Sequence, residues 1–219
     1  MSIIVAIDGP AGAGKSTIAK LVAERLGATL LDTGAIYRGL ALAARREGIA
    51  WDDEEGLAAL AAKLPLRFQL RDGENHVLLA DDDISAVIRT PEISSGASQV
   101  SGLPQVRAAL LEMQRRFADR GSVVAEGRDI GTVVFPGASV KVFMNADERA
   151  RARRRLGDLR ASGDEETTLE QVLEAQQRRD AADSGRAVAP LVPADDATQL
   201  DTSGLTVEQT VEAVLALVP

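Results

Sequence analysis

The sequence predicts an α/β fold in which a five-stranded parallel sheet carries helices on both faces. Two observations predict it. Five short β-rich runs, at residues 3–7, 29–31, 122–125, 140–144 and 198–200, alternate with stretches of helical periodicity. A glycine-rich turn also follows directly on the first run and leads into a helical pattern. Such alternation is typical of parallel sheets, whose strands are joined by crossover helices.

The composition fits one soluble globular domain over residues 1–219, with small insertions. The chain has 219 residues, of which 45% are hydrophobic and 26% charged, both ordinary values. Cysteine is absent, which excludes disulfides and thiolate metal sites. No basic leader precedes the first strand, and no apolar run approaches the roughly 18 residues of a membrane helix. We therefore expect a cytoplasmic protein with no membrane partner.

The first element is a strand followed by a phosphate-binding loop. The sequence after residues 3–7 reads G-x-x-x-x-G-K-S, and Ile18, Leu21, Val22 and Leu26 then repeat with helical spacing. Glycines let backbone N–H groups converge on a polyphosphate, whereas a chance glycine-rich turn needs neither the strand nor the helix. The expected ATP-binding residues, which we call the P-loop, are Gly9, Pro10, Ala11, Gly12, Ala13, Gly14, Lys15, Ser16 and Thr17. Lys15 would reach the terminal phosphates, and the Ser16 hydroxyl would ligate Mg²⁺.

A small β insertion is expected at about residues 63–95. Residues 66–70 and 76–79 flank a turn that contains Asp-Gly, which predicts a β-hairpin. Residues 84–88 would add a third strand to a small separate sheet. His76 is the only histidine and lies at this turn, so we expect a solvated loop residue and neither histidine catalysis nor a histidine metal site.

Two later helices carry clear start signals. Pro104 stands where a first-turn proline is tolerated, ahead of Val106 and Leu110. Thr206 and Gln209 have the spacing of a capping box before the last apolar pattern. Both predict helix starts.

Charge is unevenly distributed along an acidic chain. The 25 Lys and Arg against 33 Asp and Glu give a net charge of −8, which argues against nucleic acid as the main partner. Arg149, Arg151, Arg153, Arg154 and Arg155 nevertheless form a local cluster. These side chains would spread around a helix, so a solvated helix or a clamp over phosphates is favoured over a surface that reads a nucleic-acid groove. The polar segment 157–167 that follows predicts either a mobile lid, at about 150–167, or a plain surface loop.

Four motifs resemble the bacterial cytidylate kinase family, a group of P-loop nucleoside monophosphate kinases. They are LDTGAIYR at residues 31–38, AEGRDIGT at 125–132, GRAVAPL at 185–191, and residues 96–100 with 104–107. The resemblance runs from the first strand to the last helix. It implies a nucleoside monophosphate kinase fold and transfer of the ATP γ-phosphoryl group to CMP or dCMP with Mg²⁺. It also implies small-molecule partners only, and we expect a monomer.

The resemblance assigns roles residue by residue. The family's clamp on the CMP phosphate matches Arg38, Arg128 and Arg186, with Thr33 nearby, and its base-reading set matches Ser98, Arg107 and Asp129. The ribose contacts match Arg179 and Asp183. Lys15, Arg128 and Arg155 are the expected catalytic residues, with Arg154 or Arg155 meeting the transferring phosphoryl group. The chain departs from the family pattern at Ala181, Ala182 and Ser184, where relatives often carry charged residues.

The chemistry of the implied reaction agrees with the residue types present. The attacking phosphate oxygen is already anionic, so no general base is needed, and arginines with Mg²⁺ cancel the repulsion between two polyanions. Alternatives are a kinase for UMP, AMP or dTMP, a P-loop regulatory switch without an acceptor, and a nucleic-acid-binding ATPase. The hairpin insertion and the Arg-Asp pair at 128–129 favour cytidine. The chain also lacks the Asn-Lys-x-Asp sequence by which GTPases read guanine.

Overall fold

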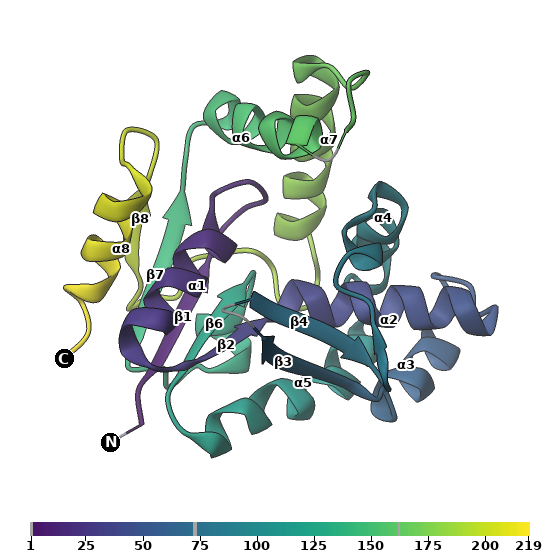
Figure 1. Ribbon diagram of the computed structural model, residues 1–219. Coiled ribbons are helices and arrows are strands. Elements are labelled where there is room, and N and C mark those ends of the chain that lie inside the picture. Colours follow the sequence, from purple (N-terminus) through teal and green to yellow (C-terminus); the bar gives the residue numbers. More distant parts are fainter. Residues whose placement is uncertain (1, 72–73, 162) are drawn as a thin grey trace. The chain divides into compact units, whose positions relative to one another are not determined.

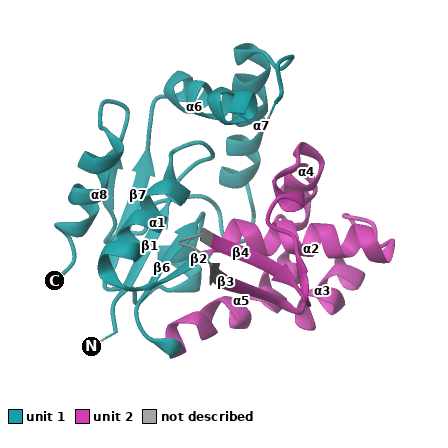
Figure 2. Cartoon of the chain, viewed as in Figure 1, with its two compact units in different colours: residues 1–31, 120–219 teal, residues 32–119 magenta. Residues whose placement is uncertain are grey.

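The computed structural model describes residues 2–71, 74–161 and 163–219, which divide into two compact units. Unit 1 comprises residues up to 31 and residues 120–219, and unit 2 comprises residues 32–119 (Figure 2). A five-stranded sheet forms the centre of unit 1, and a three-stranded sheet lies in unit 2. None of the helices in the described ranges combines the length and apolar character needed to cross a membrane.

The five-stranded sheet confirms all five predicted strands. They are β1 (Ile4–Asp8), β2 (Thr29–Asp32), β6 (Val123–Gly127), β7 (Val140–Asn145) and β8 (Thr198–Asp201), in the order β2-β6-β1-β7-β8 (Figure 1). The pairs β1–β6, β1–β7 and β7–β8 run parallel. Each strand ends one or two residues later than predicted, because the backbone ladder continues into polar residues such as Asp8. Parallel strands gather these carboxyl ends at one edge, where ligands bind in open α/β sheets.

One face of this sheet is covered by α1 (Lys15–Leu26) and α8 (Val207–Leu215). Ile7 and Val142 of the sheet pack in one apolar cluster with Ile18, Val22 and Val211 of the two helices. The predicted capping box at the start of α8 is present, with Thr206 and Gln209 each satisfying the other's backbone N–H. This packing fixes α1 directly behind β1 and so fixes the loop that joins them.

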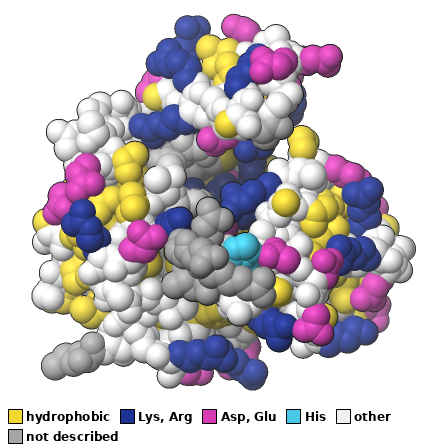
Figure 3. Space-filling view, in the orientation of Figure 1, with side chains coloured by type: hydrophobic (Ala, Val, Ile, Leu, Met, Phe, Trp, Pro, Cys, Tyr) yellow, Lys and Arg dark blue, Asp and Glu magenta, His cyan; other side chains and the backbone are white. Residues whose placement is uncertain are grey.

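Unit 1 also contains α6 (Glu148–Ala161) and α7 (Leu169–Ser184), which pack against each other. The predicted polar segment 157–167 is partly helical, since α6 continues through Gly157 to Ala161. A single glycine inside a helix costs only about 1 kcal/mol, and Leu156, Leu159 and Arg160 around it are good helix formers. Basic and acidic side chains lie side by side on the outer part of these helices (Figure 3). The assignment of residues 150–167 as a lid stays a prediction.

The helical elements of unit 2 are α2 (Thr33–Glu47), α3 (Glu54–Ala62), η1 (Val87–Arg89), α4 (Pro91–Val100), α5 (Pro104–Arg115) and η2 (Arg116–Arg120), whose last residue opens the second stretch of unit 1. Pro104 occupies the first turn of α5, as predicted. The hairpin is confirmed, with β3 (Leu66–Arg71) antiparallel to β4 (Glu74–Leu79). The centre of the predicted Asp-Gly turn, residues 72–73, lies outside the described residues.

The prediction of a third strand at residues 84–88 was wrong. The third strand is β5 (Asp82–Asp83), and the chain then turns helically, with the Ile88 N–H donating to the carbonyl oxygen of Ile84 at 3.0 Å. Ile84 and Ile88 are both buried. Their spacing of four residues is the period of a helix, which overrides the β-rich composition of the segment.

The prediction that His76 is a solvated loop residue was also wrong. His76 lies within β4, and its Nδ1 atom is 2.6 Å from Asp83 Oδ2, with 27% of the imidazole side chain exposed. The described part of β4 begins at Glu74, two residues before the predicted run 76–79, so His76 lies inside the strand and not at the turn. Hydrogen bonds from Ser85, and then from His76, lower the pKa of Asp83.

Candidate functional site

The P-loop joins β1 to α1, and three of its glycines adopt conformations that other residues avoid. Gly9, Gly12 and Gly14 have φ angles of 148°, 74° and 90°. A Cβ atom on Gly9 would lie 2.0 Å from the carbonyl oxygen of Met144. Only glycine therefore fits this path. The loop leads into the first turn of α1, and backbone N–H groups without helical partners at such a position commonly bind anions.

Lys15 is the charged centre of this loop. Its side chain is buried, and Nζ donates to the carbonyl oxygen of Pro10 at 2.8 Å. Burial is the largest cause that lowers the pKa of Lys15 to about 7, followed by the nearby charge of Arg128 and, more weakly, that of Arg179. Glu126 and Asp8 partly oppose the shift. Several cations thus converge on the loop, which is the electrostatic signature of an anion site.

Ser16 lies against a carboxylate that the sequence patterns did not single out. Its hydroxyl donates to Glu126 Oε1 at 2.5 Å, and Glu126 is the buried penultimate residue of β6. The sequence signal that could have identified Glu126 is an acidic residue at the end of a predicted apolar strand. Hydroxyl and carboxylate oxygens are the hard ligands that Mg²⁺ prefers. The described residues contain no group of three or more His, Cys, Asp or Glu side chains able to hold a metal ion.

Asp8 ties the P-loop to the turn that carries Arg128 and Asp129. Its two carboxylate oxygens accept the backbone N–H groups of Ile130 and Gly131 at 2.8 and 2.7 Å, in the first turn of η3 (Ile130–Val134). Burial raises the pKa of Asp8 to about 6, although these two hydrogen bonds oppose the shift. The residue before Gly9 therefore anchors the residues that follow β6.

Three predicted acceptor-site residues meet in unit 1. Asp183 of α7 accepts Arg128 Nε at 2.7 Å and Arg186 Nη2 at 2.5 Å. The Asp183 side chain is only 2% exposed. Burial by itself raises the pKa of Asp183, but the charges of Arg128 and Arg186 outweigh burial and the pKa is lowered. Arg179 lies one helical turn earlier on α7 and adds its charge to the same site.

Helix α6 contacts carbonyl groups of the P-loop. Arg151 Nη1 donates to the carbonyl oxygen of Ala11 at 2.9 Å and to Asp180 Oδ2 at 2.7 Å. Arg154 Nη1 lies 3.4 Å from the carbonyl oxygen of Ala13. Sequence reasoning missed the role of Arg151, because within the cluster 149–155 only the tertiary structure shows which arginine faces the loop. Arg155 is half-buried on the same helix, and its catalytic role stays a prediction.

Within unit 2, the predicted phosphate contacts lie at the start of α2. Asp32 caps this helix by accepting the Ala35 N–H at 2.8 Å, and its other oxygen lies 2.9 Å from Arg38 Nη2. Thr33 is the buried first residue of the helix. The motif at 31–38 thus places Thr33 and Arg38 on the same helix, about one and a half turns apart.

The predicted base-reading residues of unit 2 lie on α4 and α5. Arg107 is buried, donates from Nη1 to the carbonyl oxygen of Ser101 at 3.0 Å, and lies 5.5 Å from the centre of the Tyr37 ring. Such a stacked guanidinium is held in one orientation. Ser98 is half-buried on α4.

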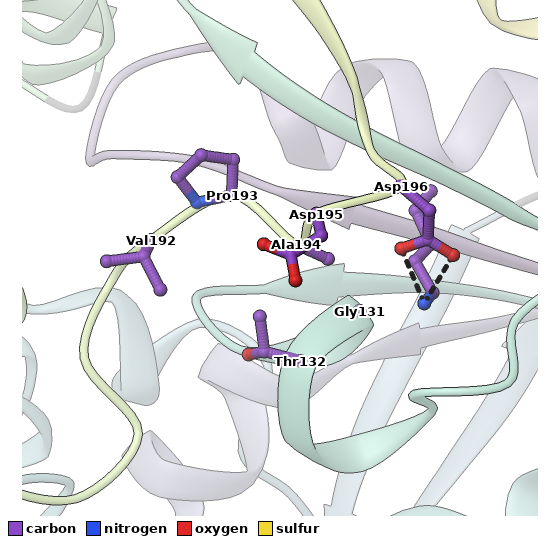
Figure 4. A pocket seen from close by; sticks show the side chains of 8 residues that line it. Gly131, Thr132, Val192, Pro193, Ala194, Asp195 and Asp196 are labelled. Atoms are coloured by element: carbon purple, nitrogen blue, oxygen red, sulfur yellow. Dashed lines mark hydrogen bonds and ion pairs between the residues drawn. The ribbon is translucent and has the colours of Figure 1, made fainter.

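A separate cavity of about 320 Å³ opens beside the Asp8 anchor, with Gly131 in its lining (Figure 4). Lys141 and Asp196 form an ion pair there, with Nζ 2.8 Å from both carboxylate oxygens. Pro193 and Asp195 also line it. The lining contains no predicted site residue, so this cavity is distinct from the P-loop and the Asp183 cluster.

Comparison with known proteins agrees with this arrangement of motifs. The family model described as cytidylate kinase matches residues 5–219. The chain belongs to the cytidylate kinase family. The cytidylate kinase of Syntrophotalea carbinolica is 49% identical over 216 residues, covering 99% of this chain and 92% of that protein. The cytidylate kinase of Pseudomonas aeruginosa is 48% identical over 217 residues, covering 97% and 93%.

Among solved structures, an uncharacterised protein from Eubacterium ventriosum shares the fold. It has a TM-score of 0.53 at 14% identity, covering 99% of this chain and 97% of that one. The predicted family and the predicted α/β fold are therefore confirmed. In a member of the cytidylate kinase family, the individual residue roles inferred from the motifs are specific enough to test.

The first test uses the pH dependence of Lys15. Its folded pKa of about 7 lies below the ordinary value of 10.5, so between these values the unfolded chain holds a proton that the folded chain has released. The contribution of Lys15 to stability therefore rises with pH between these two pKa values. The folding equilibrium constant changes by at most roughly tenfold per pH unit. We expect the free energy of unfolding of the nucleotide-free wild type to rise relative to Lys15→Met between pH 6.5 and 9, measured by urea unfolding. Parallel pH profiles for the two proteins would contradict the low pKa.

Proposed function

We propose that this protein transfers the γ-phosphoryl group of ATP to CMP or dCMP, giving ADP and CDP or dCDP. One observation carries the proposal: unit 1 holds two cationic groups, Lys15 in the P-loop and the Arg128–Arg186 pair on Asp183. A protein that only binds or hydrolyses a nucleoside triphosphate needs Lys15 but has no need of the Arg128–Arg186 pair. The relatives named cytidylate kinase support CMP as the acceptor.

The P-loop would bind the donor. Its backbone N–H groups and Lys15 would face the phosphates of ATP, and the anion would restore the charged form of Lys15. Ser16 and Glu126 would hold Mg²⁺, since their oxygens lie together and suit a hard cation. The bound ion would neutralise charge on the β- and γ-phosphates.

Arg128 and Arg186 would bind the acceptor phosphate, together with Arg38 and Thr33. Asp183 occupies one edge of each guanidinium at 2.7 and 2.5 Å, which orients the remaining N–H donors for a planar phosphate edge. Arg179 and Asp183 would also meet the ribose, and Ser98, Arg107 and Asp129 the base. The acceptor oxygen is anionic, so positioning and charge stabilisation by Lys15, Arg128 and Arg155 would suffice for transfer.

A coupled assay of ADP release across the common nucleoside monophosphates tests this function. CMP and dCMP should give the highest kcat/KM, well above UMP, AMP and dTMP. Preference for UMP or AMP would identify a different monophosphate kinase. Slow ATP hydrolysis that no monophosphate accelerates would indicate a regulatory switch instead.

Asp129 is expected to read the cytosine base. It is buried beside Arg128, and a carboxylate accepts from the N4 amine of cytosine but repels the O4 oxygen of uracil. Asp129→Ala should lower kcat/KM for CMP and narrow its advantage over UMP by about 10- to 100-fold, as expected for about 1–3 kcal/mol of discrimination. Affinity for ATP should not change. An unchanged CMP to UMP ratio would show that Asp129 only supports its neighbours.

A further inference from the structure

We propose that Gln176 of α7 binds the polyphosphate of ATP, donating from its carboxamide Nε2 to a phosphate oxygen at the Gly12 side of the P-loop. The inference rests on the proposed function and adds a donor-binding residue to it. No sequence motif points to this glutamine. Its burial, its position and the charge around it carry the argument.

The carboxamide of Gln176 is buried, and no hydrogen bond offsets the cost of its burial. The residue is 7% exposed, and neither Nε2 nor Oε1 has a hydrogen-bond partner among the described residues. A buried polar group without a partner costs about 1–3 kcal/mol. Folding alone would favour an apolar side chain of similar length, so the amide indicates a partner that arrives with a ligand.

The carboxamide lies against the P-loop. A Cβ atom on Gly12 would stand 2.6 Å from Gln176 Nε2 and 3.2 Å from both Cβ and the carbonyl oxygen of Arg151. Helices α6 and α7 therefore approach the loop at Gly12 with room only for a hydrogen atom. Since P-loop N–H groups face the phosphates, an amide donor at this place lies at the edge of the same anion site.

The neighbouring residues hold this face of α7 in place and define the ligand's charge. Asp180 lies one turn after Gln176 and accepts Arg151 Nη1, which also binds the carbonyl oxygen of Ala11. Gln176 is thus positioned by a helix already linked to the loop. With Lys15 and Arg151 close to the loop, the site suits an anion, and the amide would act as an N–H donor.

Substitution by methionine separates a ligand-binding role from a packing role. Gln176→Met keeps the length of the side chain and removes the unpartnered polar atoms. We expect ATP to bind about 10- to 100-fold more weakly, the scale of a lost hydrogen bond to a charged group, when measured by calorimetry without CMP. The urea midpoint of the nucleotide-free variant should be equal or higher, and CMP affinity should not change. Gln177→Met is the matched control, because Gln177 is exposed on the same helix and bonds to Glu148 at 3.0 Å.

Three outcomes would overturn the proposal. The first is wild-type ATP affinity in Gln176→Met. The second is a parallel loss of ATP affinity and urea midpoint, which would show a packing role. The third is wild-type ATP affinity in Gln176→Glu, a similarly sized variant whose carboxylate should repel the phosphates more strongly than methionine does. A wild-type protein that fails to bind ATP would instead refute the proposed function.

Discussion

Lys15→Ala should reduce kcat by at least about 10²-fold while the protein stays folded. A reduction of this size is typical when an enzyme loses a hydrogen-bond donor to the charge that develops in the transition state. Nζ is already directed into the P-loop, where it meets the carbonyl oxygen of Pro10 at 2.8 Å. The charged ammonium is disfavoured by burial in the nucleotide-free protein, so its removal should not lower the free energy of unfolding by an ion-pair loss.

Steady-state kinetics with saturating ATP and CMP, together with urea unfolding, measure both quantities. Lys20→Ala is the matched control, since Lys20 lies on the same helix with 43% of its side chain exposed, and its Nζ is 4.0 Å from Glu24 Oε1. It should show wild-type turnover. A folded Lys15→Ala protein with near-normal kcat would remove Lys15 from the catalytic set.

Asp183→Ala should be the most destabilising of the substitutions considered. It removes one buried carboxylate from two arginines whose side chains are 17% and 9% exposed. Breaking a buried ion pair from one side costs about 3–5 kcal/mol, because charge is left in a poorly solvated place. The same change should raise the KM for CMP, since Arg128 and Arg186 lose the group that orients them.

Urea unfolding of Asp183→Ala against Glu174→Ala measures the difference. Glu174 forms an exposed ion pair with Arg178 on the same helix, so its loss should cost less than about 1 kcal/mol. The lowered pKa of Asp183 sets the pH dependence. Its contribution should be complete above the ordinary carboxyl value of about 4 and should be lost as pH falls through the lower folded pKa. Equal destabilisation by the two substitutions would contradict a stabilising role for Asp183 as the buried partner of the two arginines.

The sequence by itself determined the elements whose signals are local. The strand–loop–helix around Lys15 depends on short-range geometry, because glycines at 9, 12 and 14 are needed for backbone paths that other residues avoid. The central strands β1, β6 and β7 were predictable because buried parallel strands are nearly continuous apolar runs. The family motifs also named acceptor residues, whose roles stay predictions. Where two local signals competed, as at Ile84 and Ile88, the helical spacing decided and the predicted strand failed.

Only the tertiary structure decided which distant residues meet. Asp8 and Gly131 are 123 positions apart, yet the Asp8 carboxylate accepts the Gly131 N–H. They meet because β1 and β6 are neighbours in the sheet. Ser16 reaches Glu126 for the same reason. Arg151 and Gln176 face the P-loop because α6 and α7 pack together beside it. Burial then changes what these residues can do: it lowers the pKa of Lys15 and raises that of Asp8, since a charge loses solvation wherever the folded chain surrounds it. No pattern along the sequence carries that information, because solvation is a property of the packed structure.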